Sequence, residues 1–278
     1  MARAPTTTTA DLVARLKKDL EDLTALTGQG LTAHNRSVVD GEIREVMAQL
    51  GRLLHDLDPI LQPTAVFDPS NPKIIGRFIA LALVAQTRAP LAAGEKFYGS
   101  GVYAIYYRGS FPLYAPLSGT ETPIYIGQAA PKVGNARTPM EQGDRLARRL
   151  EDHRRNIKKA TGTLALDDFE CRALVVQSGW ETAAEDYLIH FFQPIWNSET
   201  KILYGLGKHG DNADVRGNRR SPWDTLHPGR QWAGAAKLVD ARSREQIEGD
   251  LAKHFATRRP FDSVNDVLDE FIKELRQI

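Results

Sequence analysis

One stretch of the chain combines a dense run of positive charge with side chains that can act on a phosphate group. Between Lys132 and Lys159 there are nine Lys or Arg residues against four acidic residues, a local charge of +5. Arg149 and His153 are four residues apart, so a helix places them on one face. A permanently charged guanidinium beside an imidazole that titrates near neutrality suits chemistry on a polyanion. A solvated helix face is the alternative interpretation of the charge alone.

Two aromatic tripeptides precede this basic stretch, Gly101-Val102-Tyr103 and Tyr125-Ile126-Gly127. Each lies in a β-branched and aromatic run that predicts a strand. The ordered set then continues with Arg149, His153, Glu185 and Asn197. This set resembles the catalytic residues of the GIY-YIG nucleases. Histidine at position 153, where many members of that family carry tyrosine, is typical of its restriction-endonuclease branch.

The resemblance implies a reaction, a partner and a set of catalytic residues. It implies a type II restriction endonuclease that hydrolyses double-stranded DNA at a short GC-rich palindrome such as CCGCGG. The catalytic residues that it implies are Tyr103, Tyr125, Arg149, His153, Glu185 and Asn197. The interval between the two tripeptides is longer than is usual in the family, and this departure bears on the placement of Tyr125.

The residue types are consistent with a single-metal hydrolysis. Phosphodiester hydrolysis needs an activated water and neutralisation of charge on the phosphate. Glu185 is the one carboxylate in the set, and a single hard oxygen ligand suits Mg²⁺, which keeps most of its waters. Without the resemblance, Glu181 and Asp186 would be rival ligands. The proton acceptor stays open between Tyr103, which needs a nearby cation to lower a pKa of about 10, and His153.

Further positive charge lies in a glycine-rich stretch, 201–231, which predicts a functional loop. Arginine pairs well with guanine, so arginines there suit a GC-rich site, although some would contact only phosphates. The predicted DNA contacts lie on the basic helix and in this loop: Arg145, Arg148, Lys158, Lys208, Arg216, Asn218, Arg219, Arg220 and Arg230. A palindromic site implies two copies of the chain, so a homodimer or higher oligomer is expected.

The elements that position these residues predict an α+β fold. Strands are expected at 102–107, 123–127 and 169–176, with helices at 143–159 and 182–192. This order predicts a small antiparallel or mixed three-stranded sheet flanked by helices. The catalytic core is placed at residues 67–200, with a further helix at 72–87.

Helical additions are expected on both sides of this core. Residues 1–66 form an N-terminal extension, because leucines recur at spacings of three and four between Leu12 and Leu26. A second apolar stripe runs from Ile43 to Leu54. These stripes are candidate dimer surfaces, and packing on the same chain is an equal alternative. Residues 201–278 comprise the recognition loop and helices at 242–255 and 263–277, expected to pack on the core.

Composition excludes several other classes. The single cysteine, Cys171, excludes an intramolecular disulfide and predicts a cytoplasmic protein. No apolar run is long enough to cross a membrane. A G-x-G-x-x-G match at 205–210 is not followed by a helix pattern, so no nucleotide cofactor is expected.

Three other functions are compatible with part of the pattern. A catalytically inactive DNA-binding regulator would keep the basic surfaces and lose active-site residues, whereas all six positions are filled here. A homing nuclease usually carries a long linker and separate DNA-binding modules, and a repair nuclease carries further domains. Neither feature is evident in the sequence.

Overall fold

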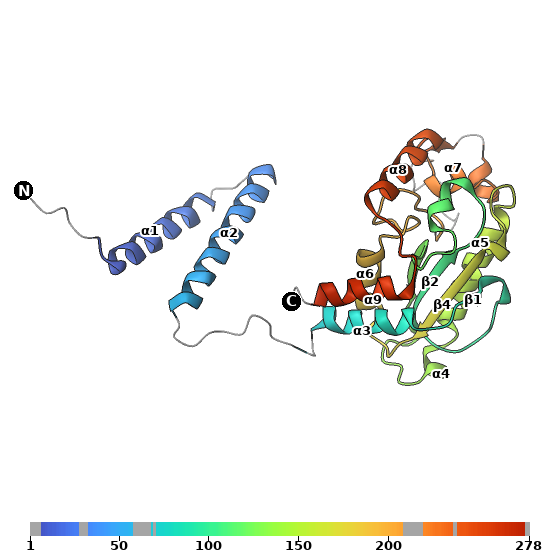
Figure 1. The fold of residues 1–278 in the computed structure, drawn as a ribbon, viewed down its shortest axis with the longest axis horizontal. Helices are drawn as coiled ribbons and strands as arrows, with labels where there is room; N and C mark the ends of the chain where they lie inside the picture. Colours follow the sequence, from blue (N-terminus) through green and yellow to red (C-terminus); the bar gives the residue numbers. More distant parts are fainter. Residues whose placement is uncertain are drawn as a thin grey trace, which may run out of the picture. The chain divides into compact units, whose positions relative to one another are not determined.

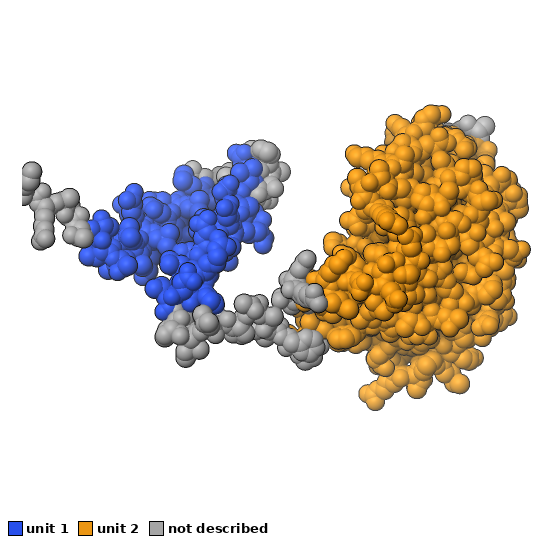
Figure 2. Space-filling model, in the orientation of Figure 1, with its two compact units in different colours: residues 1–66 blue, residues 67–278 orange. Residues whose placement is uncertain are grey.

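The computed structural model describes residues 7–27, 33–57, 68, 71–207, 219–235 and 238–275. The chain divides into two compact units, residues 1–66 and residues 67–278 (Figure 2). The first contains α1 (Thr9–Thr27) and α2 (Ala33–Leu57), which confirms both predicted helices. None of the residues of α1, all of them described, is buried, and Leu12, Leu16 and Leu20 are exposed.

The second unit is built around a sheet in which every strand pairing is antiparallel. The strands are β1 (Ala89–Pro90), β2 (Gly101–Tyr107), β3 (Tyr125–Ala129) and β4 (Phe169–Val175), in the order β1-β4-β2-β3. Figure 1 labels the first three strands of this order, β1, β4 and β2. The α+β class is confirmed. The sheet has one strand more than predicted, because β1 is a two-residue edge strand ending in proline, a residue that strand propensity places outside sheets.

Helices cover both faces of this sheet, so the central strand β2 is buried along its whole length. Its alternate residues Tyr103, Ile105 and Tyr107 pack in one core with apolar residues of α5 (Arg145–Lys159). The intervening residues of β2 pack in a second core with three helices. These helices are α3 (Pro72–Val84), α6 (Glu181–Phe192) and α9 (Val264–Leu275). The period-two alternation of β2 thus sends Tyr103 toward the basic helix α5.

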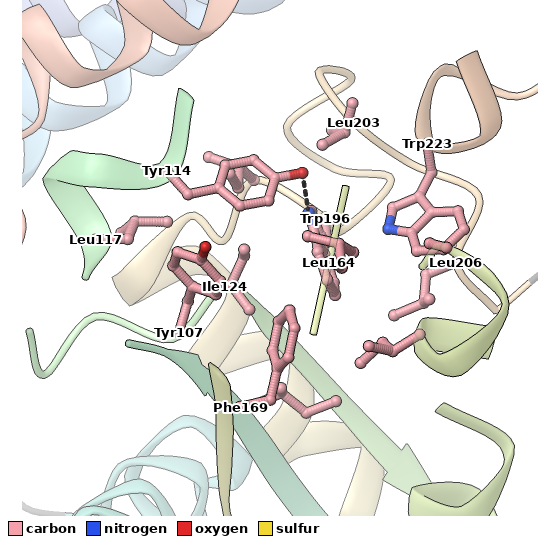
Figure 3. Packing of buried hydrophobic residues seen from close by; sticks show 14 of the residues in the cluster. Tyr107, Tyr114, Leu117, Ile124, Leu164, Phe169, Trp196, Leu203, Leu206 and Trp223 are labelled. Atoms are coloured by element: carbon pink, nitrogen blue, oxygen red, sulfur yellow. Dashed lines mark hydrogen bonds between the residues drawn. The ribbon is translucent and has the colours of Figure 1, made fainter. Parts of the chain in front are cut away.

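The long interval between the two tripeptides folds as part of the core. It contains the 3₁₀ helix η2 (Pro112–Leu117). Tyr114 of η2 is buried and accepts a hydrogen bond from Trp196 Nε1 at 2.9 Å (Figure 3). The Tyr114 hydroxyl also contacts His227, whose pKa burial lowers to about 3. The insertion is therefore fixed by a neutral, fully buried aromatic network.

The remaining elements follow the sheet toward the C-terminus. Residues 201–231, predicted as a loop, contain the short helix α7 (Pro222–Leu226) in their described part. Two-residue strands β5 (Arg219–Arg220) and β6 (Val239–Asp240) pair in parallel, and η5 (Gln231–Gly234) lies between them in the sequence. Helix α8 (Arg244–Thr257) begins at a capping box formed by Ser243 and Gln246. The other short helices in the described part of the chain are η1 (Leu91–Ala93), α4 (Pro139–Gln142) and η3 (Leu166–Asp168).

No helix formed by the described residues has both the length and the apolar character that a bilayer crossing requires.

Candidate active site

Tyr103 and His153 form a buried pair between the sheet and α5. The Tyr103 hydroxyl and His153 Nε2 are 2.6 Å apart, within one hydrogen bond. Tyr103 is 0% exposed and His153 is 1% exposed. Tyr103 reaches the histidine because it is the third residue of β2, on the face that α5 covers. This geometry allows a proton to pass from the phenol to the imidazole.

The environment of Tyr103 opposes its ionisation in the free protein. Burial raises the pKa of the Tyr103 phenol well above 10, and the nearby Tyr125 raises it further. The guanidinium of Arg149 acts in the opposite direction and lowers that pKa. Burial is the largest of these effects, so the phenol is neutral at physiological pH.

Tyr125 and Arg149 bring a phenol and a cation to the same place. The ring of Tyr125 lies 4.8 Å from that of His153 and 6.1 Å from that of Tyr103, measured between centroids. Arg149 lowers the pKa of Tyr125, although burial raises it more strongly. Within the described part of the chain, Arg149 forms no ion pair with a carboxylate. Its charge is therefore available to an anionic group from outside.

Glu185 lines a pocket next to these groups. The pocket has a volume of about 220 Å³, and Tyr125 and Asn197 also line it. Burial raises the pKa of Glu185 to about 7, and the negative charge of Asp186 contributes in the same direction. A backbone hydrogen bond from Gln128 and the charge of Arg149 lower it in part. Because few interactions stabilise the negative charge of Glu185, binding of a cation beside this carboxylate is favourable.

Asn197 is present at this pocket, but its side chain is already paired. Its Oδ1 accepts a hydrogen bond from the Ile126 N–H at 3.0 Å, and its Nδ2 donates to the Ile126 carbonyl at 2.9 Å. Asn197 thus occupies both backbone groups of an edge-strand residue, next to Tyr125. This pairing fixes β3 where the second tripeptide lies.

A buried polar network behind the site has no counterpart in the sequence prediction. Glu181 accepts hydrogen bonds from Ser100 Oγ at 2.9 Å and from the Gly179 N–H at 2.7 Å. The Ser100 N–H donates to Gln142 Oε1 at 2.9 Å. Glu181 is therefore committed to joining the start of α6 to the start of β2. This rules it out as the rival of Glu185, which stands one helical turn further along α6.

The pocket fits a hard divalent cation that keeps its waters. Among the described residues, no three His, Cys, Asp or Glu side chains form a metal-binding cluster. Glu185 offers one carboxylate, and a volume of about 220 Å³ holds several waters at about 30 Å³ each. A single carboxylate with a shell of water and substrate oxygens is a coordination typical of Mg²⁺.

The predicted DNA contacts on α5 lie on the surface. Arg145, Arg148 and Lys158 are all exposed. Arg148 pairs with Asp144 at 2.7 Å, an exposed ion pair of little energetic value that a phosphate can replace. Arg219 is exposed, whereas the partly exposed Arg220 pairs with Asp240 at 2.5 Å. Three other predicted contacts lie outside the described residues, namely Lys208, Arg216 and Asn218.

The structure contradicts the predicted DNA contact at Arg230. Its side chain is 2% exposed and forms a bidentate ion pair with Asp224, with both N–O distances 2.6 Å. The guanidinium lies over the rings of Trp223 and Trp232. Arg219 and Arg230 carry the same charge and lie in the same glycine-rich stretch, so only burial distinguishes them. Arg230 is an internal anchor and is not available to DNA.

Most of the unit formed by residues 67–278 matches a known protein family. The family model described as the Eco29kI GIY-YIG domain matches residues 95–255, more than half of the chain. All six predicted catalytic residues fall within that span, and residues 1–66 fall outside it. No curated protein matches the chain.

Proposed function

Since this chain belongs to the Eco29kI family of GIY-YIG restriction endonucleases, we propose that it cuts both strands of DNA at a short GC-rich palindrome, with CCGCGG as the first candidate. It is a restriction enzyme that acts on DNA. The observation that supports the site most directly is the 2.6 Å contact between Tyr103 and His153, close to Arg149 and to the pocket of Glu185.

In the proposed mechanism, His153 is the final acceptor of the proton from the attacking water. Because burial keeps the Tyr103 phenol neutral, it gives its own proton to His153 Nε2 as it takes one from the water. A direct phenolate base would need the pKa of Tyr103 to fall below its ordinary value, the opposite of the shift here. The tyrosine is therefore a relay.

Two other residues act on the phosphate in this proposal. Arg149 stabilises the negative charge that develops on the phosphate oxygens, since among the described residues no carboxylate forms an ion pair with its guanidinium, although the charge of Asp152 acts on it from further away. Tyr125 lines the pocket and orients the phosphate and the water. The GIY-YIG family is generally metal-dependent, and we propose that the metal is Mg²⁺ held by Glu185. When bound, Mg²⁺ supplies charge neutralisation at the phosphate and acidifies its water.

We further propose that two copies bind one palindrome, because twofold-related half-sites call for twofold-related readers. Sedimentation of the protein with a duplex containing the site, in Ca²⁺ in place of Mg²⁺, is expected to give two chains per duplex. A single chain per duplex would contradict this stoichiometry. The DNA substrate and the single cysteine favour the cytoplasm as the compartment.

The function is tested by incubating unmethylated plasmid DNA with the purified protein and Mg²⁺, then sequencing the fragment ends. Discrete fragments whose ends share one GC-rich palindrome are expected. Glu185→Ala is the matched control and is expected to bind the DNA without cutting it. Random ends, or equal cutting by the Glu185→Ala protein, would refute the proposal.

A further inference from the structure

The tripeptide Gly205-Leu206-Gly207, part of the G-x-G-x-x-G match at 205–210, lies at the candidate active site. Gly205 and Gly207 both line the pocket that contains Glu185 and Tyr125. Leu206 points into the aromatic core beside Trp223 (Figure 3). A stretch of backbone with no side chain facing the pocket therefore closes one of its sides.

The two glycines are needed for different reasons. Gly205 has φ +120°, and a Cβ there would lie 2.3 Å from Ser221 Oγ, so the fold itself requires glycine. At Gly207 the backbone is not in the left-handed region, and a Cβ would clash with nothing. Its nearest neighbours would be Arg149 Nη2 at 3.6 Å and Tyr125 Oη at 3.8 Å. An alanine is therefore compatible with the fold, but its methyl group would stand against the two groups that face the phosphate.

The tripeptide is held rigidly from behind. Arg230 donates to the Gly205 carbonyl at 2.8 Å and to the Leu206 carbonyl at 3.1 Å. Asn156 of α5 also donates to the Leu206 carbonyl, at 3.1 Å. Asp224 fixes the Arg230 guanidinium with two further bonds. The carbonyls are thus turned toward Arg230 and away from the pocket, and the hydrogen bond from Asn156 joins this backbone to α5.

We propose that Gly205–Gly207 is the backbone wall of the phosphate pocket, and that Gly207 lacks a side chain so that a DNA phosphodiester group fits against Arg149 and Tyr125. Gly207 and Arg230 are positioning residues in this arrangement. The inference rests on the proposed nuclease function, because the occupant of the pocket is the scissile phosphate. It also explains why Arg230 is buried, whereas Arg219 is exposed and Arg220 is partly exposed in the same stretch.

The test compares Gly207→Ala and Gly207→Val with the control Gly162→Ala, an exposed glycine whose Cβ would meet no atom within 4 Å. Cleavage of a plasmid carrying the site is measured beside the thermal unfolding midpoint. Gly207→Ala is expected to keep the wild-type midpoint and to lose roughly 10- to 100-fold in turnover. Gly207→Val is expected to lose more, and Gly162→Ala to match the wild type in both measurements.

Two results would overturn the inference while leaving the nuclease function intact. One is a Gly207→Ala protein that cuts within about twofold of the wild type. The other is a fall in its unfolding midpoint that accounts for the lost activity, which would make Gly207 a requirement of the fold. Failure of the wild-type protein itself to cut DNA would instead refute the proposed function, so the two failures are distinguishable.

Discussion

Replacing Glu185 by glutamine is expected to abolish cleavage and, at the same time, to stabilise the metal-free protein. The amide has nearly the shape of the carboxyl group but does not ionise. Burial raises the pKa of Glu185 from 4.5 to about 7, with Asp186 adding to the rise. Ionising this carboxyl therefore costs more in the folded protein than in the unfolded chain. The glutamine variant avoids this cost.

The size and the pH range of the effect follow from the pKa. Between pH 4.5 and pH 7, Glu185 is protonated more often in the folded protein than in the unfolded chain. The free energy of unfolding of the wild type therefore falls as pH rises through this range. The pKa rise from 4.5 to about 7 corresponds to about 3.5 kcal/mol, since a pKa change of one is worth roughly 1.4 kcal/mol. The advantage of Glu185→Gln over the wild type should therefore grow by about 3.5 kcal/mol between acid pH and pH 8, with any constant offset subtracted.

Urea unfolding of both proteins in EDTA, from pH 4.5 to pH 8.5, measures this difference directly. Glu95→Gln is the control, because Glu95 is exposed to solvent and does not line the pocket of Glu185. Addition of Mg²⁺ should raise the unfolding midpoint of the wild type and leave that of Glu185→Gln unchanged. A stability difference between Glu185→Gln and the wild type that does not vary with pH would refute the reasoning.

Three further expectations concern the roles of individual side chains. Arg149→Ala should lower turnover by about 10²- to 10³-fold with a much smaller loss of DNA affinity; an equal loss in both would make it a plain binding contact. Tyr103→Phe and His153→Ala should each lower turnover, and the double variant should lose little more than the worse single one, since a relay acts as a unit; additive losses in single-turnover cleavage would argue against the relay. Arg219→Ala should reduce the salt slope of DNA binding by about one unit, as measured by salt titration. Arg230→Ala should instead lower the free energy of unfolding in urea by about 3–5 kcal/mol, because it leaves the buried Asp224 carboxylate unpaired. The opposite pair of results would exchange the two assignments.

Local sequence pattern predicted most of the secondary structure and the main candidates for catalysis. Alternation along 102–107 fixes which residues of β2 share a face, and the four-residue interval fixes Arg149 and His153 on one helix face. Capping residues such as Ser243 mark helix ends, because a side chain satisfies backbone groups only a few residues away. These properties depend on neighbours in the chain, so the sequence alone determines them.

Pairings between distant segments were decided only by the tertiary structure. Charge predicts Arg219 and Arg230 alike as DNA contacts, but Arg230 is buried against Asp224. The carboxyl of Glu181 is occupied by Ser100, some eighty residues earlier in the chain, while Glu185 one turn later is left to the pocket. Gly207 gains its significance only because the fold sets its backbone against Arg149. Whether a polar side chain is free to bind a ligand depends on the partner that folding brings to it. That partner lies far away in the sequence, so local sequence pattern does not reveal it.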